Sequence, residues 1–219
     1  DKNVRGEVFN DVFFKTQNTL VSFYTRLNYA LKEKYLLTFT LRRDGSSRFS
    51  PDTRWGTFPS AAFAWKINEE GFMQGSNLFS NLKLRLGYGV TGQQDVGSDY
   101  PYLSRYTPSE PTAQYQFGND FFATLRPEGY DANIKWEQTE TLNAGLDWAI
   151  RSGRVSGAID VYSRKTKDLL SVIPVPAGSN LTNQILTNVG NIENSGVEFT
   201  LNTRLIEKEK LSWDFGFNV

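Results

Sequence analysis

Hydrophobic and polar residues alternate along most of this chain. In residues 82–90 one parity holds Leu82, Leu84, Leu86, Tyr88 and Val90, and the other holds Lys83, Arg85, Gly87 and Gly89. Residues 211–219 divide in the same way. A period of two places alternate side chains on opposite faces of a β-strand, so the pattern predicts an all-β chain.

The alternation predicts eight antiparallel strands. They lie at residues 21–29, 35–43, 57–66, 82–90, 141–148, 155–164, 197–205 and 211–219. Several approach the nine to eleven or so residues that a tilted membrane strand needs. No long helix is expected, although residues 68–80 leave room for a short one.

The connections between these strands differ in length. The short polar ones are residues 32–34, 151–154 and 206–210, and residues 67–81 are intermediate. The long ones, rich in Gly, Pro, Ser and Asn, are residues 44–56, 91–135 and 166–194. Outer-membrane barrels have short periplasmic turns and long outer loops, so the alternation of lengths predicts an orientation.

Alternation alone also fits a β-sandwich, and the aromatic residues favour a membrane barrel instead. Five of them share the apolar parity of their strands and lie near the shorter connections: Tyr29, Tyr35, Trp65, Trp148 and Trp213. Barrels collect such rings at the lipid–water boundary, on the lipid-facing side. The opposite parity mixes Gly, Asn, Ser, Asp and Arg, which suits a wet lumen. We therefore expect a transmembrane antiparallel β-barrel with an aromatic girdle.

Composition narrows the classes of function. The 219 residues carry 24 Lys+Arg and 24 Asp+Glu, so no basic surface points to a nucleic-acid partner. Cys and His are both absent, which removes thiolate nucleophiles, the commonest general base and the usual zinc ligands. No run approaches the roughly eighteen apolar residues of a membrane helix. The first ten residues lack the layout of a signal peptide.

Acidic residues provide only weak candidates for chemistry. The pairs Glu137/Glu140 and Glu69/Glu70 lie beside turns or strand ends, where nothing indicates the raised pKa of a general acid. The acids of the longest loop fit no calcium-loop spacing: Asp95, Asp99 and Asp120. We expect no catalytic residue, no cofactor and no metal site.

Five stretches of the chain carry a family signature. They are RRDGSSRFSPDTRWGTFPSAAFAW (residues 42–65), LKLRLGYGVTGQQ (82–94), KWEQTETLNAGLDWAI (135–150), IDVYSRKTKDLL (159–170) and NVGNIENSGVEFTLN (188–202). In this order they resemble the SusC/RagA family of TonB-linked outer-membrane proteins, over most of the chain from about residue 18 onward.

The resemblance implies a bacterial outer-membrane barrel, usually of twenty-two strands, filled by an N-terminal plug and capped by a SusD-like lipoprotein. It implies contact with membrane lipid and import of glycans or oligopeptides, with energy delivered through TonB. We expect residues 1–219 to be part of the barrel, without the signal peptide, TonB box, plug or last strand. The alternative is a self-contained small barrel, in which the eight strands close alone in a structural or adhesive role. An enzyme on the rim of such a barrel is a third and weaker option.

Aromatic residues of the long loops are the best candidates for contacts. Those on segments expected to project outward are Trp55, Tyr100, Tyr102, Tyr106, Tyr115, Phe117, Phe121 and Phe122. Their rings could stack on sugars or grip a partner, or they could pack the loops against one another or against the lipoprotein. Three arginines of the polar parity, Arg26, Arg85 and Arg204, are expected to face the lumen or the plug. For these a structural role is favoured over substrate binding.

Overall fold

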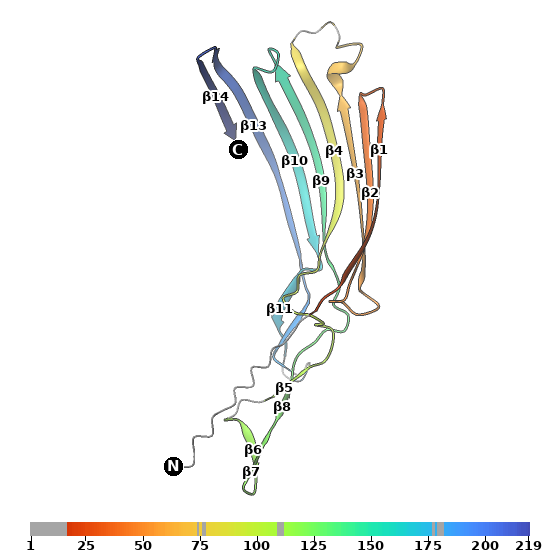
Figure 1. The fold of residues 1–219 in the computed structure, drawn as a ribbon, viewed down its shortest axis with the longest axis vertical. Coiled ribbons are helices and arrows are strands. Elements are labelled where there is room, and N and C mark those ends of the chain that lie inside the picture. The colour runs from red at the N-terminus through yellow and green to blue at the C-terminus, as the bar shows by residue number, and fades with distance from the viewer. Residues whose placement is uncertain (1–16, 74, 76–77, 109–111, 177, 179–181) are drawn as a thin grey trace.

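The computed structural model describes residues 17–73, 75, 78–108, 112–176, 178 and 182–219 (Figure 1). Eight long strands form one sheet: β1 (Leu20–Leu31), β2 (Tyr35–Ser46), β3 (Trp55–Lys66), β4 (Phe79–Gln93), β9 (Glu137–Ile150), β10 (Val155–Lys167), β13 (Asn191–Lys208) and β14 (Leu211–Asn218). Each strand pairs antiparallel with the next in this order. All eight predicted strands are confirmed, and most extend beyond the predicted ends.

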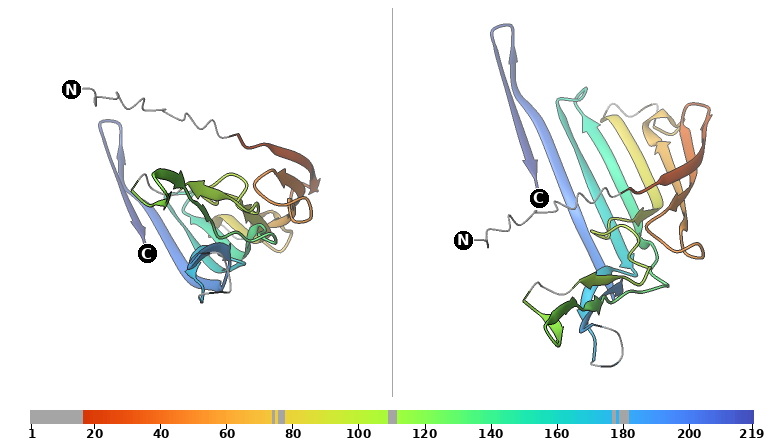
Figure 2. Two further views of the ribbon diagram at one scale, coloured as in Figure 1. Left: turned by 90° about the horizontal axis from the view of Figure 1, so that it is seen from below. Right: turned by 60° about the horizontal axis from the view of Figure 1, so that its bottom comes forward.

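The sheet is curved and open. Figure 2 shows the strands following an arc from β14 to β1. β1 and β14 are the two edge strands of the sheet, and within the described part of the chain each pairs with one neighbour alone. The eight strands therefore do not close on themselves. This disfavours the self-contained small barrel and fits one part of a larger barrel.

Two of the tight turns use a left-handed backbone. Lys32 and Glu33, between β1 and β2, have φ angles of 51° and 56°. Arg151 and Ser152, between β9 and β10, have φ angles of 51° and 57°. Two successive residues with positive φ are typical of type I′ turns, whose twist matches the right-handed twist of paired strands. The turn geometry therefore fits the long twisted hairpins on either side.

A β-bulge in β13 corrects the predicted parity. The pairing with β14 shifts between Arg204 and Ile206, so that Ile206 lies opposite Trp213. Leu205, predicted on the apolar parity, is the extra residue, and Ile206 takes the apolar position. Strict alternation cannot show this, because a bulge inserts one residue into one strand. A second shift follows Phe79 in β4.

The longer connections contain structure that alternation does not predict. A 3-10 helix, η1 (Ile67–Glu69), follows β3 where a short helix was expected within residues 68–80. The loop between β4 and β9 holds two antiparallel pairs: β5 (Tyr106–Pro108) with β8 (Leu125–Pro127), and β6 (Gln114–Phe117) with β7 (Asp120–Ala123). The loop between β10 and β13 holds β11 (Leu170–Pro174) paired with β12 (Gln184–Asn188). Strands of three to five residues are too short for a period of two to become visible.

The buried core lies at the end of the sheet next to the long loops, where Phe58 of β3 and Val90 of β4 meet loop residues. Its members are Phe49, Phe58, Val90, Val96, Ile134 and Trp136. Along the sheet, large apolar side chains such as Leu27, Leu142 and Val197 stay exposed. The structure thus has two parts, a sheet with a bare apolar face and a loop end with a core of its own.

Candidate functional surfaces of the sheet and the loop end

The sheet has one apolar face and one polar face. A row of directly paired residues across six strands is apolar: Tyr35, Trp65, Leu84, Leu146, Ile159 and Phe199. Apart from one leucine, the adjacent row consists of charged and small residues: Leu36, Ala64, Arg85, Gly145, Asp160 and Glu198. Because neighbours on a strand point to opposite faces, the two rows lie on opposite sides of the sheet. The register therefore agrees with the parity that the sequence predicts.

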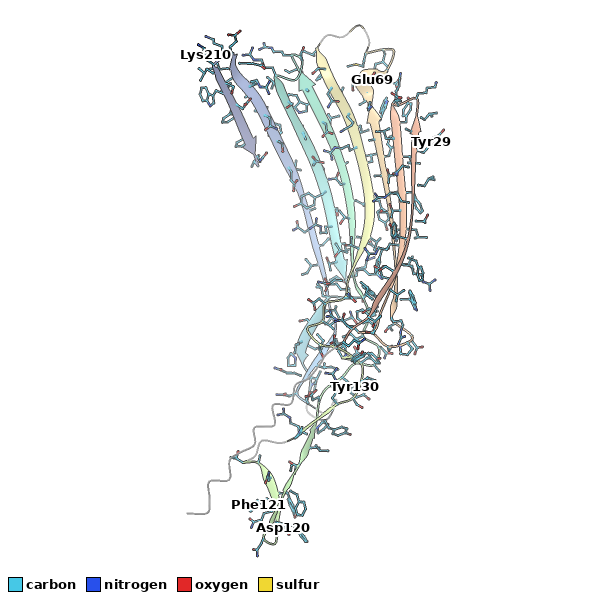
Figure 3. All side chains as sticks on the ribbon, viewed as in Figure 1. Tyr29, Glu69, Asp120, Phe121, Tyr130 and Lys210 are labelled. Atoms are coloured by element: carbon cyan, nitrogen blue, oxygen red, sulfur yellow. The ribbon has the colours of Figure 1, made fainter. Side chains whose placement is uncertain are left out.

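The predicted girdle residues lie on the apolar face near the short turns. They are Tyr29, Tyr35, Trp65, Trp148 and Trp213. Figure 3 labels Tyr29 at this end of the sheet, together with Glu69 and Lys210. The rings of Tyr35 and Trp65 stack, with centroids 6.2 Å apart and planes at 17°. The Trp148 ring lies over Gly157, where an added Cβ would come within 2.7 Å of the indole. Their role at a lipid boundary stays a prediction.

One carboxylate ties the stacked pair to the turn after β3. The Tyr35 hydroxyl donates a hydrogen bond to Glu70 at 2.6 Å, and Trp65 Nε1 donates another at 3.0 Å. The Lys34 ammonium lies 3.4 Å from the second oxygen of Glu70. The hydrogen bonds from Tyr35 and Trp65, aided by Lys34, hold the pKa of the Glu70 carboxyl below its ordinary value. Glu70 is therefore an anchor for the aromatic ring pair.

The polar face carries a four-membered ion-pair network. Arg85 of β4 donates to Asp147 of β9 at 2.8 Å and to Asp160 of β10 at 2.9 Å. Lys83 lies 2.8 Å from Asp147. The network therefore links three neighbouring strands. The Arg85 side chain is 34% exposed, which leaves the network in contact with whatever fills the space beside this face.

Gly145 makes the Arg85–Asp160 contact possible. It lies on β9, directly between Arg85 and Asp160 in the register. A Cβ there would collide with the Asp160 carboxylate and approach Arg85 Nη2 to 2.7 Å. Gly87, on the same face, has room, because an added Cβ would have its nearest neighbour, Asn143 Cβ, at 4.0 Å. A larger residue would therefore clash at Gly145 but not at Gly87, and the sequence alone does not reveal this difference.

The other two predicted lumen arginines also make contacts on the sheet. Arg26 Nε donates to the Thr40 hydroxyl at 3.2 Å. Arg204 pairs with Asp214 at 3.1 Å and with Glu207 at 2.9 Å. Arg26 and Arg85 lie in polar rows, and Arg204 is paired opposite Asp214 just before the bulge. Contact with a plug stays a prediction for all three.

The core of the loop end centres on Trp136. Its ring lies 5.2 Å from that of Phe49 and 5.3 Å from that of Phe58, centroid to centroid. Trp136 Nε1 donates to the Arg54 carbonyl at 2.9 Å, and the Thr53 hydroxyl donates to a neighbouring carbonyl, that of Ile134, at 2.7 Å. Sequence reasoning missed this cluster, because its members come from loops and strand ends that lie far apart in the chain. The signal was a tryptophan immediately before β9, in a segment with no alternation.

The predicted loop aromatics fall into two groups. Tyr100 and Tyr102 pack edge to face with centroids 6.4 Å apart, and Tyr102 also contacts the core. The second group is exposed on and beside the β6–β7 hairpin: Tyr106, Tyr115, Phe117, Phe121 and Phe122. Figure 3 places Phe121 and Asp120 at the tip farthest from the sheet. We call residues 106–108 and 112–127 the aromatic arm.

Trp55 is placed differently from the prediction. It begins β3 instead of lying in an outer loop, because β2 runs to Ser46 and the intervening loop is shorter than predicted. Its ring stacks on Phe23, with centroids 6.3 Å apart, and Arg43 lies over it at 5.5 Å. Gly45 permits this arrangement, since an added Cβ would meet the indole at 2.8 Å. Trp55 thus shares the apolar face with the girdle residues, at the opposite end of β3.

Two acidic residues of the longest loop form ion pairs with one arginine. Arg48 lies 3.0 Å from Asp95 and 3.4 Å from Asp99, at a polar cavity of about 710 Å³ that Arg105 also lines. Asp120 lies apart from them, on β7. Within the described residues, no group of three or more His, Cys, Asp or Glu is arranged to hold a metal ion.

Comparison with known proteins identifies the family. Residues 2–219 match the family described as TonB dependent receptor-like, beta-barrel. The chain belongs to the TonB-dependent receptor β-barrel family. This confirms the fold class predicted from alternation and the outer-membrane location implied by the resemblance.

Individual receptors are similar over nearly all of the chain. The TonB-dependent receptor SusC of Bacteroides thetaiotaomicron is 50% identical over 206 residues, which cover 94% of this chain and 20% of SusC. The TonB-dependent receptor P26 of Formosa agariphila is 41% identical and is covered to 19%, against 89% of this chain. A structure of the RagAB peptide transporter superposes with a TM-score of 0.76 at 28% identity, covering 92% of this chain and 22% of that one. The chain thus spans about a fifth of the length of the receptors it matches.

Because the chain belongs to the TonB-dependent receptor family, the surroundings of the two faces of the sheet can be stated. In an outer-membrane barrel the apolar face is turned to lipid and the polar face to the lumen. Among the described residues no helix is long and apolar enough to cross a membrane.

Proposed function

We propose that the receptor containing this segment actively imports large nutrients, either glycans or oligopeptides, across the outer membrane. It works with a SusD-like surface lipoprotein, and TonB supplies energy through an N-terminal region of the receptor. The observation that carries the proposal is the open, two-faced sheet of a chain that is half identical to SusC. The likeness to a peptide transporter keeps oligopeptides beside glycans as a substrate class.

In this proposal residues 1–219 form wall and outer loops of the barrel domain. Strands β1 and β14 each have one unpaired edge, to which neighbouring strands of the same barrel add. A complete barrel of about twenty-two strands lies within the range of bacterial outer-membrane proteins. The segment binds and guides its cargo without chemistry, because it has neither His nor Cys and Glu70 is engaged by three donors.

The polar face lines the lumen and meets the plug. Arg85 already has two carboxylate partners on the sheet, which favours a structural role over capture of a substrate. Arg26 and Arg204 have sheet partners as well. We assign all three arginines to shaping the wall against the plug or lumen water.

The aromatic arm contacts the lipoprotein or the substrate. Tyr115 and Phe122 are paired across the β6–β7 hairpin, so their rings lie on one face of it, and alternation adds Phe117 to that face. Phe117 is 71% exposed, and exposed aromatic clusters of this kind mark interaction sites. Tyr106 extends this surface toward the sheet, while Tyr100 and Tyr102 position the loop from which the arm emerges.

Growth of the native host on defined nutrients tests the proposal. A strain lacking the full-length receptor is compared with its parent on a panel of polymeric glycans and oligopeptides, and on the corresponding monomers. We expect loss of growth on one polymer but not on its monomers. The full-length gene should restore growth, and the gene with Tyr115, Phe117 and Phe122 changed to Ser should restore it only in part. Equal growth of both strains on every polymer would contradict import.

A further inference from the structure

We propose that the polar cavity at the loop end binds a neutral sugar ring of the imported nutrient. The cavity lies between the segment that leads into β1, the loop after β2 and the loop after β4. The residues of its walls that carry the argument are Arg48, Asp95, Ser98, Asp99, Tyr100 and Arg105. The inference rests on the proposed function, and it favours glycans over oligopeptides as the cargo.

The hydrophobic core of the loop end holds the walls of this cavity in place. Arg48 precedes Phe49, which is completely buried in the core. Asp95 and Gly97 flank Val96, another core residue that is 8% exposed. Neighbouring residues in these two loops therefore point alternately to the core and to the cavity. Walls that are fixed in this way lose little freedom when a ligand binds, which favours affinity.

The backbone at Tyr100 has a conformation that is uncommon for a tyrosine. Its φ angle is 58°, in the left-handed region. Two contacts hold it there: the hydroxyl donates to the Gln17 carbonyl at 2.8 Å, and the ring packs edge to face against Tyr102, which contacts the core. Local strain of this kind is found at ligand-binding sites, where it fixes a group before the ligand arrives. Tyr100 thereby supplies a rigid aromatic wall to an otherwise polar cavity.

Asp95 provides a free hydrogen-bond acceptor. Its carboxylate accepts from Arg48 Nη1 at 3.0 Å and from the Gly97 amide at 3.3 Å, and both bonds end on Oδ1. Among the described residues no donor bonds to the other oxygen, Oδ2. The side chain is 70% exposed. Oδ1 therefore holds the loop together, and Oδ2 stays available to a ligand.

Arg105 provides the matching donor. Its Nη1 donates to the Ser98 hydroxyl at 3.3 Å, and within the part of the chain that the structure describes no carboxylate forms an ion pair with it. Arg48 differs, because it lies 3.0 Å from Asp95 and 3.4 Å from Asp99. Of the two guanidinium groups on the walls, one is therefore neutralised by the protein and the other keeps its donors for a ligand.

A neutral sugar fits this combination of groups. A hydroxyl group both donates and accepts, so adjacent hydroxyls of one ring can donate to Asp95 Oδ2 and accept from Arg105. The two guanidinium groups and two carboxylates of the walls cancel, which gives no advantage to an anionic or a cationic ligand. The volume of about 710 Å³ lies within the range of small-molecule sites, roughly 300–1,000 Å³. An acidic sugar or a charged peptide terminus fits less well.

Isothermal titration calorimetry of the full-length receptor in detergent tests the proposal. The neutral probes are maltohexaose, mannohexaose and xylohexaose, and the competing probes are oligogalacturonate and hexaalanine. We expect binding of at least one neutral probe. Asp95→Asn keeps an oxygen for Arg48 and the Gly97 amide but turns the free acceptor into a donor, and Arg105→Gln removes the charged donor. Each should weaken that binding by about tenfold, the effect of losing a charge-assisted hydrogen bond.

Asp52→Asn is the matched control for the loss of charge. Asp52 is an exposed acid of the loop after β2 that does not line the cavity, so its substitution should change the affinity by less than about twofold. Hydrogen exchange of residues 94–105 verifies that the loop keeps its structure in each variant. Arg105→Gln tests the site independently of the loop, because Arg105 takes no part in the ion pairs of Arg48.

Three results would overturn the assignment. Unchanged affinity in both variants would show that the sugar binds elsewhere, even where the growth experiment supports import. Binding of none of the neutral probes would remove the sugar site. Tighter binding of oligogalacturonate or hexaalanine than of every neutral probe would assign the cavity to a charged ligand. Failure of the proposed function is distinct from all three, since the strain without the receptor would then grow like its parent on every polymer.

Discussion

The sheet and the loop end reach stability by different routes. At the loop end Phe49 and Ile134 are completely buried and Trp136 is 4% exposed, as in the core of a water-soluble domain. On the sheet Leu142 is 57% exposed and Val197 is 66% exposed, although both lie in the middle of well-paired strands. Burial of apolar surface can therefore hold the loop end together in water, whereas the apolar face of the sheet is covered only when lipid surrounds it.

The sequence encodes the sheet and the loop end in different ways. The sheet repeats one rule, alternation, because its two faces meet two different solvents along its whole length. The loop end follows no period, because its core is assembled from segments that lie far apart in the chain. On the sheet, the effect of a substitution on stability should accordingly depend on which face the residue occupies. At the loop end, it should depend on how closely the side chain is packed.

Trp136→Ala should have the largest effect, and the effect should stay at the loop end. Replacing a buried tryptophan by alanine typically costs about 3–5 kcal/mol, because a cavity replaces its ring contacts. Hydrogen exchange of the full-length receptor should show lost protection in the loops around Phe49 and Ile134 and unchanged protection in β9 and β10. Phe117→Ala, an exposed control, should change little. Uniform loss of protection over loops and sheet would remove the distinction.

Leu86→Arg tests the lipid-facing side of the sheet. An arginine near the middle of the lipid face costs about 2–4 kcal/mol, because the charge enters hydrocarbon. Asn143→Arg is the matched control, since Asn143 is paired with Gly87 on the polar face. Folding into vesicles under a urea gradient should show a lower midpoint for Leu86→Arg and a much smaller change for Asn143→Arg. Similar losses for both would mean that the two faces meet the same surroundings.

Gly145→Ala tests whether close packing also operates on the polar face. The added methyl would separate Arg85 from Asp160, and overpacking of this kind costs about 1–3 kcal/mol. Gly87→Ala, on the same face with open space, should be nearly neutral. Unfolding of both variants in urea, followed by tryptophan fluorescence, gives the comparison. Equal stability of the two variants would show that the Arg85–Asp160 contact contributes nothing.

The smallest expected effect is a pH dependence at the short-turn end. Because the folded pKa of Glu70 lies below its unfolded value, its contribution is complete above the unfolded value of about 4.3 and is lost as the pH falls through the folded one. The thermal midpoint of the wild type should therefore fall in this acidic range slightly more than that of Glu70→Gln. Parallel curves for the two proteins would remove Glu70 as an anchor of Tyr35 and Trp65.

The strands and their faces could be predicted because each carries many repeats of one pattern. Leu82 to Val90 alone shows four full alternations, and the observed register keeps the same parity. The parity failed at Leu205, where a bulge adds one residue that leaves no trace in composition. The sequence predicts a loop at Trp55, because the Gly, Ser and Pro residues before it hide the start of β3.

The candidate sites could be predicted only in part, since they depend on contacts between distant segments. The sequence offered Arg85, but its bonds to Asp147 and Asp160 follow from the register of three strands. The β6–β7 hairpin carried a usable signal, a Gly118-Asn119 pair between two aromatic runs, which is a recognised two-residue turn. For the core around Trp136 the sequence offered only a tryptophan in a segment with no alternation, which does not identify the residues that pack against it.

Site-directed spin labelling of three consecutive residues in β9 tests the central claim most directly. Labels are placed one at a time at Leu142, Asn143 and Ala144 in a cysteine-free version of the full-length receptor in lipid bilayers. Leu142 and Ala144 lie on the apolar face and Asn143 lies on the polar face. Labels at 142 and 144 should be accessible to oxygen dissolved in the bilayer and shielded from a water-soluble relaxing agent, and the label at 143 should show the reverse. The same accessibility at all three positions, or lipid exposure at 143 alone, would contradict the two-faced wall.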